Sequence, residues 1–135
     1  MEMQNGGDLR KEILRRKGTP FEEKKAKQII NDILKGMKVL VEKLVVHRDL
    51  KPENVFISNG KYKVADFGFC QTYTPGQILD LCCGTPGYMS PQIVLEEKYT
   101  EKCDIWSIGV IYYELLFNNF PGKGNSDEER INDLK

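Results

Sequence analysis

Four residues whose side chains can take part in acid–base and metal chemistry lie close together in the sequence. Asp49, Lys51 and Asn54 belong to the run HRDLKPEN, and a second carboxylate, Asp66, comes twelve residues after Asn54. Pro52 within the run disfavours a helix, so we expect a loop there. A carboxylate can accept a proton, and amide and carboxylate oxygens suit a hard divalent cation. The run is therefore predicted to bring a proton acceptor and a metal ligand to one reaction centre.

A β-hairpin is predicted directly after this loop. Residues 55–58 and 61–65 have strand character, and the Asn-Gly pair between them accepts the positive φ of a type I′ turn. Asn54 precedes the first strand and Asp66 follows the second. Because the two strands run antiparallel, these two candidate metal ligands are predicted to lie close together.

A long helix is predicted before the loop. Thr19 is expected as its N-cap, Pro20 as its first helical residue and Glu22 as the partner in a capping box, and the helix should end near Glu42. Apolar residues at helical spacing are expected to face a core. These residues are Ile29, Ile30, Ile33, Leu34, Met37, Leu40 and Val41.

Two further helices are predicted, one on each side of these elements. A short helix over 9–17 can be capped by Asp8 and ended by Gly18. A helix over 100–117 is apolar around most of its circumference, which predicts a place at the centre of the domain. Residues 69–92 have few helix or strand signals and are expected to form a long irregular segment.

The cysteines give no indication of a zinc site. Cys70, Cys82, Cys83 and Cys103 fit no zinc-ligand spacing, and His47 is the single histidine. We expect free thiols in a reducing compartment, with redox sensitivity of the adjacent Cys82 and Cys83 as the alternative.

Composition favours one ordinary globular domain. The chain has 135 residues, of which 40% are apolar and 30% charged, and its net charge is zero. Zero net charge gives no electrostatic argument for nucleic acid or an anionic membrane as a partner. No apolar run approaches the length of a membrane span, and the first residues do not resemble a signal peptide, so a cytoplasmic location is expected.

The run HRDLKPEN followed by Asp66-Phe67-Gly68 resembles the catalytic loop and magnesium-binding motif of eukaryotic-type protein kinases. The resemblance implies transfer of the γ-phosphoryl group of ATP, with magnesium, to a protein hydroxyl. By the same resemblance, Asp49 orients the hydroxyl and accepts its proton, Lys51 steadies the moving phosphoryl group, and Asn54 and Asp66 hold the metal. The LysProGluAsn form is similar to serine/threonine kinases, in particular the calmodulin-dependent and Unc-51-like groups.

Other positions are assigned supporting roles by the resemblance. His47 and Phe67 match residues of the family's buried spine, in which an aromatic contact sets the catalytic loop, and Gly68 follows Phe67. His47 is therefore expected to be structural. Asp104 matches the acid that anchors the catalytic loop to a central helix. Thr85, in the run GTPGY, matches a residue that bridges the catalytic Asp and Lys.

The nucleotide-binding residues are also implied by the resemblance alone. Residues 1–8 resemble the hinge between kinase lobes, where Glu2 and Gln4 would bind adenine through their backbone and Asp8 would bind the ribose. Phe56 matches the residue beneath the adenine ring.

Regulation by phosphorylation is left open by the sequence. Arg48 matches a residue that binds an activating phosphate, whereas Leu81 stands where many relatives carry the phosphorylated threonine. The carboxylate of Asp80 could partly take the place of that phosphate, or Thr72 or Thr74 could be phosphorylated instead. In addition, Gln92 replaces the acid of the usual Ala-Pro-Glu motif.

The resemblance implies a kinase-like fold that is mainly α with a small β-hairpin, and only the C-terminal lobe of it. The N-terminal lobe, with its glycine-rich loop and strand lysine, and the distal C-lobe helices are expected to be absent from residues 1–135. Met1 would fall on an internal kinase position, which suggests a truncated sequence. Within this partial domain we expect a hinge (1–8), a catalytic loop (47–54), an activation segment (66–92) and a central helix (100–117).

Two functions follow as hypotheses. The first is a serine/threonine protein kinase, present here as a truncated and inactive piece, whose partners are a Ser/Thr-containing protein substrate and the missing lobe. The second is a non-catalytic kinase-like module that competes for substrates or partners. The intact set Asp49, Lys51, Asn54 and Asp66 favours the first.

Overall fold

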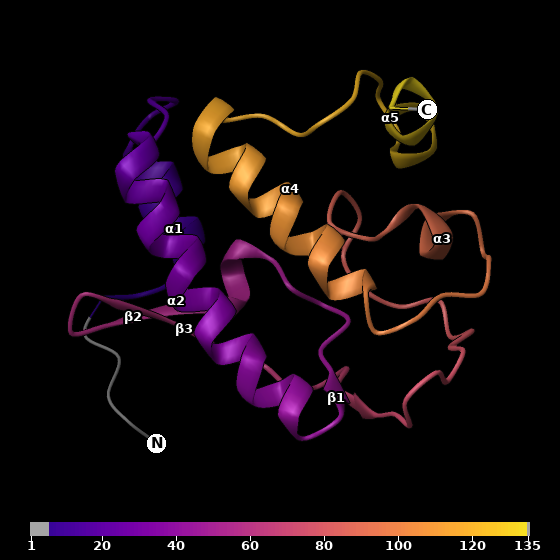
Figure 1. Cartoon of the computed structure of the whole chain (residues 1–135). Coiled ribbons are helices and arrows are strands. Elements are labelled where there is room, and N and C mark those ends of the chain that lie inside the picture. The colour runs from indigo at the N-terminus through magenta and orange to yellow at the C-terminus, as the bar shows by residue number, and fades with distance from the viewer. Residues whose placement is uncertain (1–5, 135) are drawn as a thin grey trace.

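The computed structural model describes residues 6–134 as helices and two small antiparallel sheets (Figure 1). The helices are α1 (Leu9–Arg15), α2 (Glu23–Glu42), the 3-10 helix η1 (Pro52–Asn54), α3 (Pro91–Val94), α4 (Cys103–Phe117) and α5 (Asp127–Asp133). The strands are β1 (Val45–Val46), β2 (Val55–Ser58), β3 (Lys61–Val64) and β4 (Gln71–Thr72).

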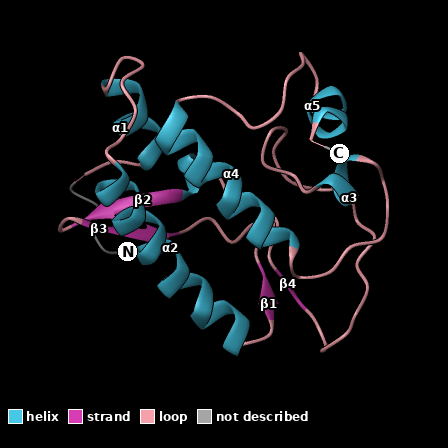
Figure 2. Ribbon diagram, turned by 45° about the horizontal axis from the view of Figure 1, so that its top comes forward, coloured by secondary structure: helices cyan, strands magenta, loops and turns pink. Residues whose placement is uncertain are grey.

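The predicted hairpin is confirmed as β2 and β3. Their register pairs Val55 with Val64, and Asn59 and Gly60 turn the chain with φ values of 50° and 72°. A second sheet, in which β1 pairs with β4, was not predicted and lies apart from the hairpin (Figure 2). Two-residue strands are too short for an alternating pattern, so their pairing depends on the tertiary fold.

The helix after residue 8 is confirmed with a shorter span. The Asp8 carboxylate accepts a hydrogen bond from the Lys11 backbone N–H at 2.9 Å, which is the predicted cap. The helix ends at Arg15, two residues earlier than expected, because Lys17 and Gly18 take the left-handed conformation with φ values of 48° and 84°.

The predicted start of the long helix is wrong. Helix α2 begins at Glu23, and neither Thr19 nor any other side chain caps it. Tertiary contacts hold the preceding segment extended: the backbone N–H of Phe21 donates to the Leu115 carbonyl at 2.8 Å, and the Phe21 side chain is buried. The Arg16 guanidinium lies 4.2 Å from the Phe21 ring centroid. The predicted end at Glu42 is confirmed.

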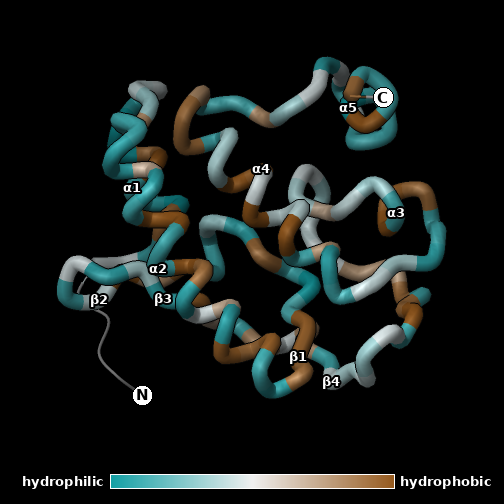
Figure 3. The backbone as a smooth tube through the Cα atoms, viewed as in Figure 1, coloured by the Kyte–Doolittle hydropathy of each residue, from teal (hydrophilic) through white to brown (hydrophobic). Residues whose placement is uncertain are grey.

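The core is built where α1, α2 and the hairpin pack around one face of α4. Figure 3 shows hydrophobic residues along α4, which crosses the molecule. The largest fully buried apolar side chains are Leu9, Ile29, Ile33, Leu50, Ile111 and Leu115. A second cluster joins Val46 and Tyr99 to Tyr73 and Leu79 of residues 69–92.

Some apolar residues that were expected to face the core are exposed. Leu34 and Val41 of α2 are 43% and 51% exposed, and Ile105 of α4 is 61% exposed. Helix α4 crosses the molecule, but only part of its apolar circumference is buried, because α2 packs against one of its faces.

The charged tail forms a helix that the sequence reasoning missed. The Ser126 side chain accepts a hydrogen bond from the Glu129 backbone N–H at 3.2 Å and caps α5. The pattern Ser-x-x-Glu could have indicated this start. No helix within residues 6–134 combines the length and apolar character needed to cross a membrane.

Candidate active site

Helix α4 fixes the backbone of the loop that carries the candidate catalytic residues. The two carboxylate oxygens of Asp104 accept hydrogen bonds from the backbone N–H groups of His47 and Arg48, each at 2.8 Å. Burial raises the pKa of Asp104, and these two hydrogen bonds oppose that effect. Arg48 has a φ of 68°, which is unfavourable for a residue with a Cβ, so the paired carboxylate holds a strained turn in place.

His47 connects this loop to the segment after β3. Its ring is fully buried, with Nε2 3.1 Å from the Ala65 carbonyl oxygen and Nδ1 3.3 Å from the Asp49 backbone nitrogen. The ring also meets that of Phe67 edge to face, with 5.7 Å between centroids. The expected burial of this pair is right for His47 and wrong for Phe67, which is 54% exposed. Both ring nitrogens of His47 therefore face backbone groups of the protein.

Asp49, Lys51 and Thr85 form a closed set of polar contacts. The Thr85 hydroxyl donates to Asp49 Oδ1 at 2.6 Å and accepts from Lys51 Nζ at 2.6 Å, and Lys51 Nζ lies 3.1 Å from Asp49 Oδ2. Asp49 is 5% exposed, whereas Lys51 is half-buried. The arrangement fixes the Asp49 carboxylate and the Lys51 ammonium group relative to one another.

Asn54 and Asp66 have the chemistry of a magnesium site that includes phosphate oxygens. Asn54 Nδ2 donates to the Asp49 carbonyl oxygen at 2.8 Å and to its Oδ2 at 3.2 Å, which leaves the amide oxygen as the atom that can face a cation. The Ala65 N–H donates to the Asn54 carbonyl at 2.9 Å, as expected from the hairpin, and Asp66 follows with an exposed carboxylate. Residues 6–134 contain no group of three or more His, Cys, Asp or Glu that could hold a metal alone. Magnesium commonly takes one or two protein ligands and completes its shell with phosphate and water.

Comparison with known proteins decides the family. The family model described as "Protein kinase domain" matches residues 1–135. The chain belongs to the protein kinase domain family. The sequence-based resemblance to eukaryotic-type serine/threonine kinases is thereby confirmed.

Curated relatives of this protein kinase domain include two proteins of Dictyostelium discoideum and one of Arabidopsis thaliana. "Probable serine/threonine-protein kinase MARK-C" of Dictyostelium discoideum is 40% identical over 131 residues, which cover 96% of this chain and 17% of the relative. Serine/threonine-protein kinase atg1 of the same organism is 37% identical over 139 residues, which cover 100% of this chain and 20% of the relative. Serine/threonine-protein kinase ATG1a of Arabidopsis thaliana is 38% identical over 130 residues, which cover 93% of this chain and 20% of the relative. The chain thus spans about a fifth or less of the length of these relatives.

The expected nucleotide-binding residues are only partly described. Glu2 and Gln4 lie outside the described residues. The structure brings Asp8 and Phe56 together in an isolated antiparallel bridge, and Phe56 is half-buried. The Asp8 carboxylate is engaged locally, as the cap of α1 and with Lys11 Nζ at 3.3 Å.

Arg48 reaches into the segment after Asp66. Its Nε donates to the Phe69 carbonyl and its NH1 to Gln71 Oε1, both at 2.8 Å. The backbone N–H of Gly68 lies 3.2 Å from Asp66 Oδ1, to which it donates a hydrogen bond. Arg48 therefore links the loop over residues 47–54 to the segment that follows Asp66.

An ionic cluster beside the catalytic loop was missed by the sequence reasoning. Arg10 pairs with Glu53 at 2.9 Å and with the buried carboxylate of Glu114, and the Tyr88 hydroxyl bonds both Arg10 and Glu114. Burial and the neighbouring carboxylate of Glu114 raise the pKa of Tyr88, so its hydroxyl keeps its proton. Because these residues lie on four separate segments, no local sequence pattern could have indicated the cluster.

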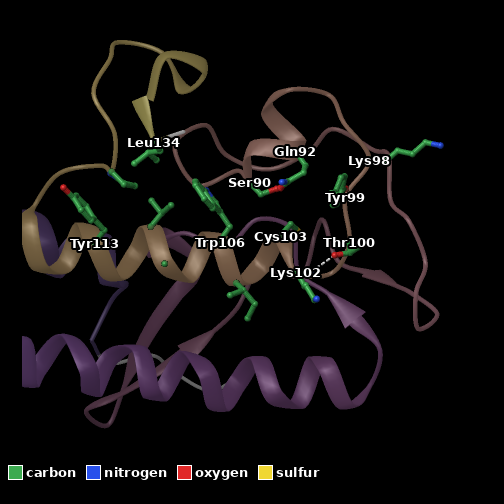
Figure 4. Close-up of a pocket in the computed structure, with 14 residues that line it drawn as sticks. Ser90, Gln92, Lys98, Tyr99, Thr100, Lys102, Cys103, Trp106, Tyr113 and Leu134 are labelled. Carbon is green, nitrogen blue, oxygen red and sulfur yellow. Dashed lines mark hydrogen bonds between the residues drawn. The ribbon is translucent and has the colours of Figure 1, made fainter. Parts of the chain in front are cut away.

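A large groove along α4 does not contain the candidate catalytic residues. It has a volume of about 1020 Å³, and Figure 4 shows Trp106, Tyr113 and Leu134 around it, on the side of α4 away from α2. Asp49, Lys51 and the residues bonded to them are not part of its lining. The candidate active site is thus defined by its polar contacts and not by the larger groove.

Proposed function

We propose that this chain is the catalytic, C-terminal-lobe part of a serine/threonine protein kinase. The parent enzyme transfers the γ-phosphoryl group of ATP to a serine or threonine hydroxyl on a protein. The observation that carries this proposal is the closed set formed by Asp49, Lys51 and Thr85, next to Asn54. Relatives named as serine/threonine-protein kinases support the substrate class.

In the proposed reaction, the substrate hydroxyl attacks the γ-phosphorus and the bond to ADP breaks. Asp49 accepts the proton of that hydroxyl, and Thr85 keeps its carboxylate in one orientation. Lys51 places its positive charge beside the phosphoryl group in transit. Asn54 and Asp66 would hold magnesium, which neutralises charge on the phosphates of ATP.

The remaining residues of the site would support this reaction. Asp8 and Phe56 are proposed to bind the ribose and adenine of ATP, together with Glu2 and Gln4. His47, Arg48, Phe67, Gly68 and Asp104 are proposed to set the loop and the activation segment. The cytoplasm is the proposed location, and four free cysteines are compatible with its reducing conditions.

We propose that residues 1–135 alone have negligible turnover. The sequence contains no glycine-rich phosphate loop and no Val-Ala-x-Lys run, so half of the nucleotide cleft would have to come from other residues. Phe67 and Phe69 are 54% and 49% exposed beside the metal-ligand candidates, as expected of a surface that another lobe covers.

Fusion to an N-terminal lobe tests the proposal. The lobe of the related Arabidopsis ATG1a kinase, placed ahead of residue 1, should produce transfer of radiolabelled phosphate from ATP to a generic Ser/Thr protein in the presence of magnesium. The lobe alone and this chain alone serve as controls and should show background transfer. A folded fusion without activity would contradict the proposed kinase function, and activity of the chain alone would contradict its proposed dependence on a second lobe.

A non-catalytic kinase-like module is the second candidate function. The large groove along α4 and the exposed side chains Ile105 and Phe117, 61% and 59% exposed, favour a binding role. Such a module would compete for kinase partners without needing Asp49. An inactive fusion that still captured a substrate protein would favour this candidate over the enzyme.

A further inference from the structure

A tight turn over residues 85–88 carries Thr85, the side chain that bridges Asp49 and Lys51. The turn is closed by a hydrogen bond of 3.1 Å from the Tyr88 backbone N–H to the Thr85 carbonyl oxygen. At the first residue of this turn, the Thr85 hydroxyl bonds both Asp49 and Lys51. The position of that hydroxyl therefore depends on what fixes the backbone of residues 85–88.

A carboxylate of α5 holds this turn at Gly87. Asp127 Oδ2 accepts a hydrogen bond of 2.5 Å from the Gly87 backbone N–H, across 40 residues of sequence. Gly87 has a φ of 89°, and because glycine adopts many backbone conformations, the chain by itself does not fix this part of the turn. A hydrogen bond to an ionised acceptor is roughly twice as strong as one between neutral groups. The Asp127 carboxylate is thus well suited to hold the Gly87 amide in one position.

Asp127 is itself held in one orientation. It is the first residue of α5, directly after the capping residue Ser126. Ile131 lies one helical turn later on the same face and is 5% exposed, so this face of α5 is packed against the protein. Arg130 NH1 lies 3.0 Å from Asp127 Oδ1, the carboxylate oxygen that does not face Gly87. One oxygen is therefore bound to the guanidinium and the other to the Gly87 amide.

Two aromatic rings continue the contact between α5 and the turn. The Arg130 guanidinium lies 5.3 Å from the centroid of the Phe120 ring, and that ring meets the Tyr88 ring edge to face with 5.3 Å between centroids. A Cβ built on Gly87 would lie 2.9 Å from Phe120 Cε1, so the ring packs directly on the glycine. The turn is therefore packed against Phe120 as well as hydrogen-bonded to α5.

We propose that Asp127 is a positioning residue for the phosphoryl transfer, acting through the Gly87 amide on the turn that carries Thr85. Its carboxylate keeps the turn in the conformation in which the Thr85 hydroxyl bonds Asp49 and Lys51. Small displacements of the groups that react lower the rate strongly, so loss of the hydrogen bond to Gly87 should be visible in catalysis. This inference rests on the proposed kinase function and adds α5 to the elements that set its site.

Steady-state kinetics of the fusion with the ATG1a N-terminal lobe tests this role. Asp127→Ala should lower kcat about tenfold and leave the KM for ATP unchanged, because the residues proposed to bind ATP lie elsewhere. Asp127→Asn keeps an oxygen that can accept the Gly87 N–H and should retain most of kcat. Asp133→Ala is the matched control: it removes another carboxylate of α5, which accepts the Lys123 backbone N–H at 3.0 Å, and should transfer phosphate normally.

A double-variant cycle separates the positioning of Thr85 from general stabilisation. Because Asp127 is proposed to act through Thr85, Asp127→Ala should cost little further rate when Thr85→Val is already present. A general loss of stability would lower the rate by the same factor with either residue at position 85. Should Asp127→Ala not fold, Arg130→Gln takes its place in the cycle, since it releases the carboxylate from its fixed orientation and should lower kcat only when Thr85 is present.

The unmodified fusion distinguishes failure of this inference from failure of the proposed function. If it transfers no phosphate although folded, the proposed kinase function is contradicted. If it is active, the proposal is overturned by equal factors in the two arms of the cycle. Equal rates for Asp127→Ala and Asp133→Ala, with both variants folded by circular dichroism, would overturn it as well.

Discussion

The Thr85 hydroxyl donates a hydrogen bond of 2.6 Å to the carboxylate of Asp49, across 36 residues of sequence. The same hydroxyl accepts a hydrogen bond from Lys51, so one side chain of the proposed activation segment fixes both charged groups of the proposed catalytic loop. A kinase domain can therefore couple the position of this segment to the geometry of its proposed catalytic base.

Loss of the Thr85 hydroxyl should reduce phosphoryl transfer more than it reduces stability. In the fusion with an N-terminal lobe, Thr85→Val removes both hydrogen bonds but keeps the side-chain shape, and we expect a rate roughly a hundredfold lower. Thr85→Ser keeps the hydroxyl and should retain most of the rate. Radiolabelled phosphate transfer measures both variants, and equal losses in the two would show that the hydroxyl is not what matters.

Asp104 should be a major determinant of stability. Asp104→Ala removes the carboxylate that accepts the backbone N–H groups of His47 and Arg48, leaving buried donors without partners. We expect the free energy of unfolding to fall by about 3 kcal/mol. Urea denaturation followed by the fluorescence of Trp106 measures it, with Asp80→Ala as an exposed control. An unchanged unfolding midpoint for Asp104→Ala would mean that α4 does not hold the loop.

The ionic cluster should contribute more than a surface ion pair. Glu114→Ala leaves the half-buried Arg10 without its buried partner, and we expect a loss of about 3 kcal/mol in the free energy of unfolding. Lys27→Ala breaks the fully exposed pair with Glu23 and should leave the urea midpoint unchanged. Similar urea midpoints for Glu114→Ala and Lys27→Ala would mean that Glu114 contributes no more than an exposed residue, which would contradict a stabilising role of the cluster.

The buried thiol of Cys103 should make stability depend on alkaline pH. Burial raises the pKa of Cys103 from 9.0 to about 12, so between these values the unfolded chain loses a proton that the folded chain keeps. This contribution is full below pH 9 and is lost as the pH rises toward 12. Cys103→Ala should show a shallower decline of the melting temperature over this range. An identical decline would mean that other groups, such as tyrosines, account for all of it.

Local sequence signals were sufficient where a structure depends on neighbouring residues. Asn59 and Gly60 determine the hairpin turn by their tolerance of positive φ, and Asp8 caps α1 through the nearby Lys11 N–H. These contacts span at most three residues, so the sequence carries their full cause. The placement of Asn54 before the hairpin follows from the same local geometry.

The features that were missed depend on residues far apart in sequence. Thr19 looked like an N-cap, but the Phe21 N–H is taken by Leu115 at the end of α4, which keeps the segment extended. The cluster of Arg10 and Glu114 joins residues 104 positions apart. Propensity and spacing cannot indicate such pairs, because the tertiary packing that brings them together is decided by the whole core.

Asp49 is the proposed proton acceptor of the phosphoryl transfer. The most direct test compares the lobe fusion with its Asp49→Asn variant for transfer of radiolabelled phosphate to a protein substrate, with Glu97→Gln as an exposed control. We predict that Asp49→Asn lowers the rate by roughly 10²-fold or more, while the control transfers phosphate normally. Normal transfer by a correctly folded Asp49→Asn variant would contradict the proposed role of Asp49.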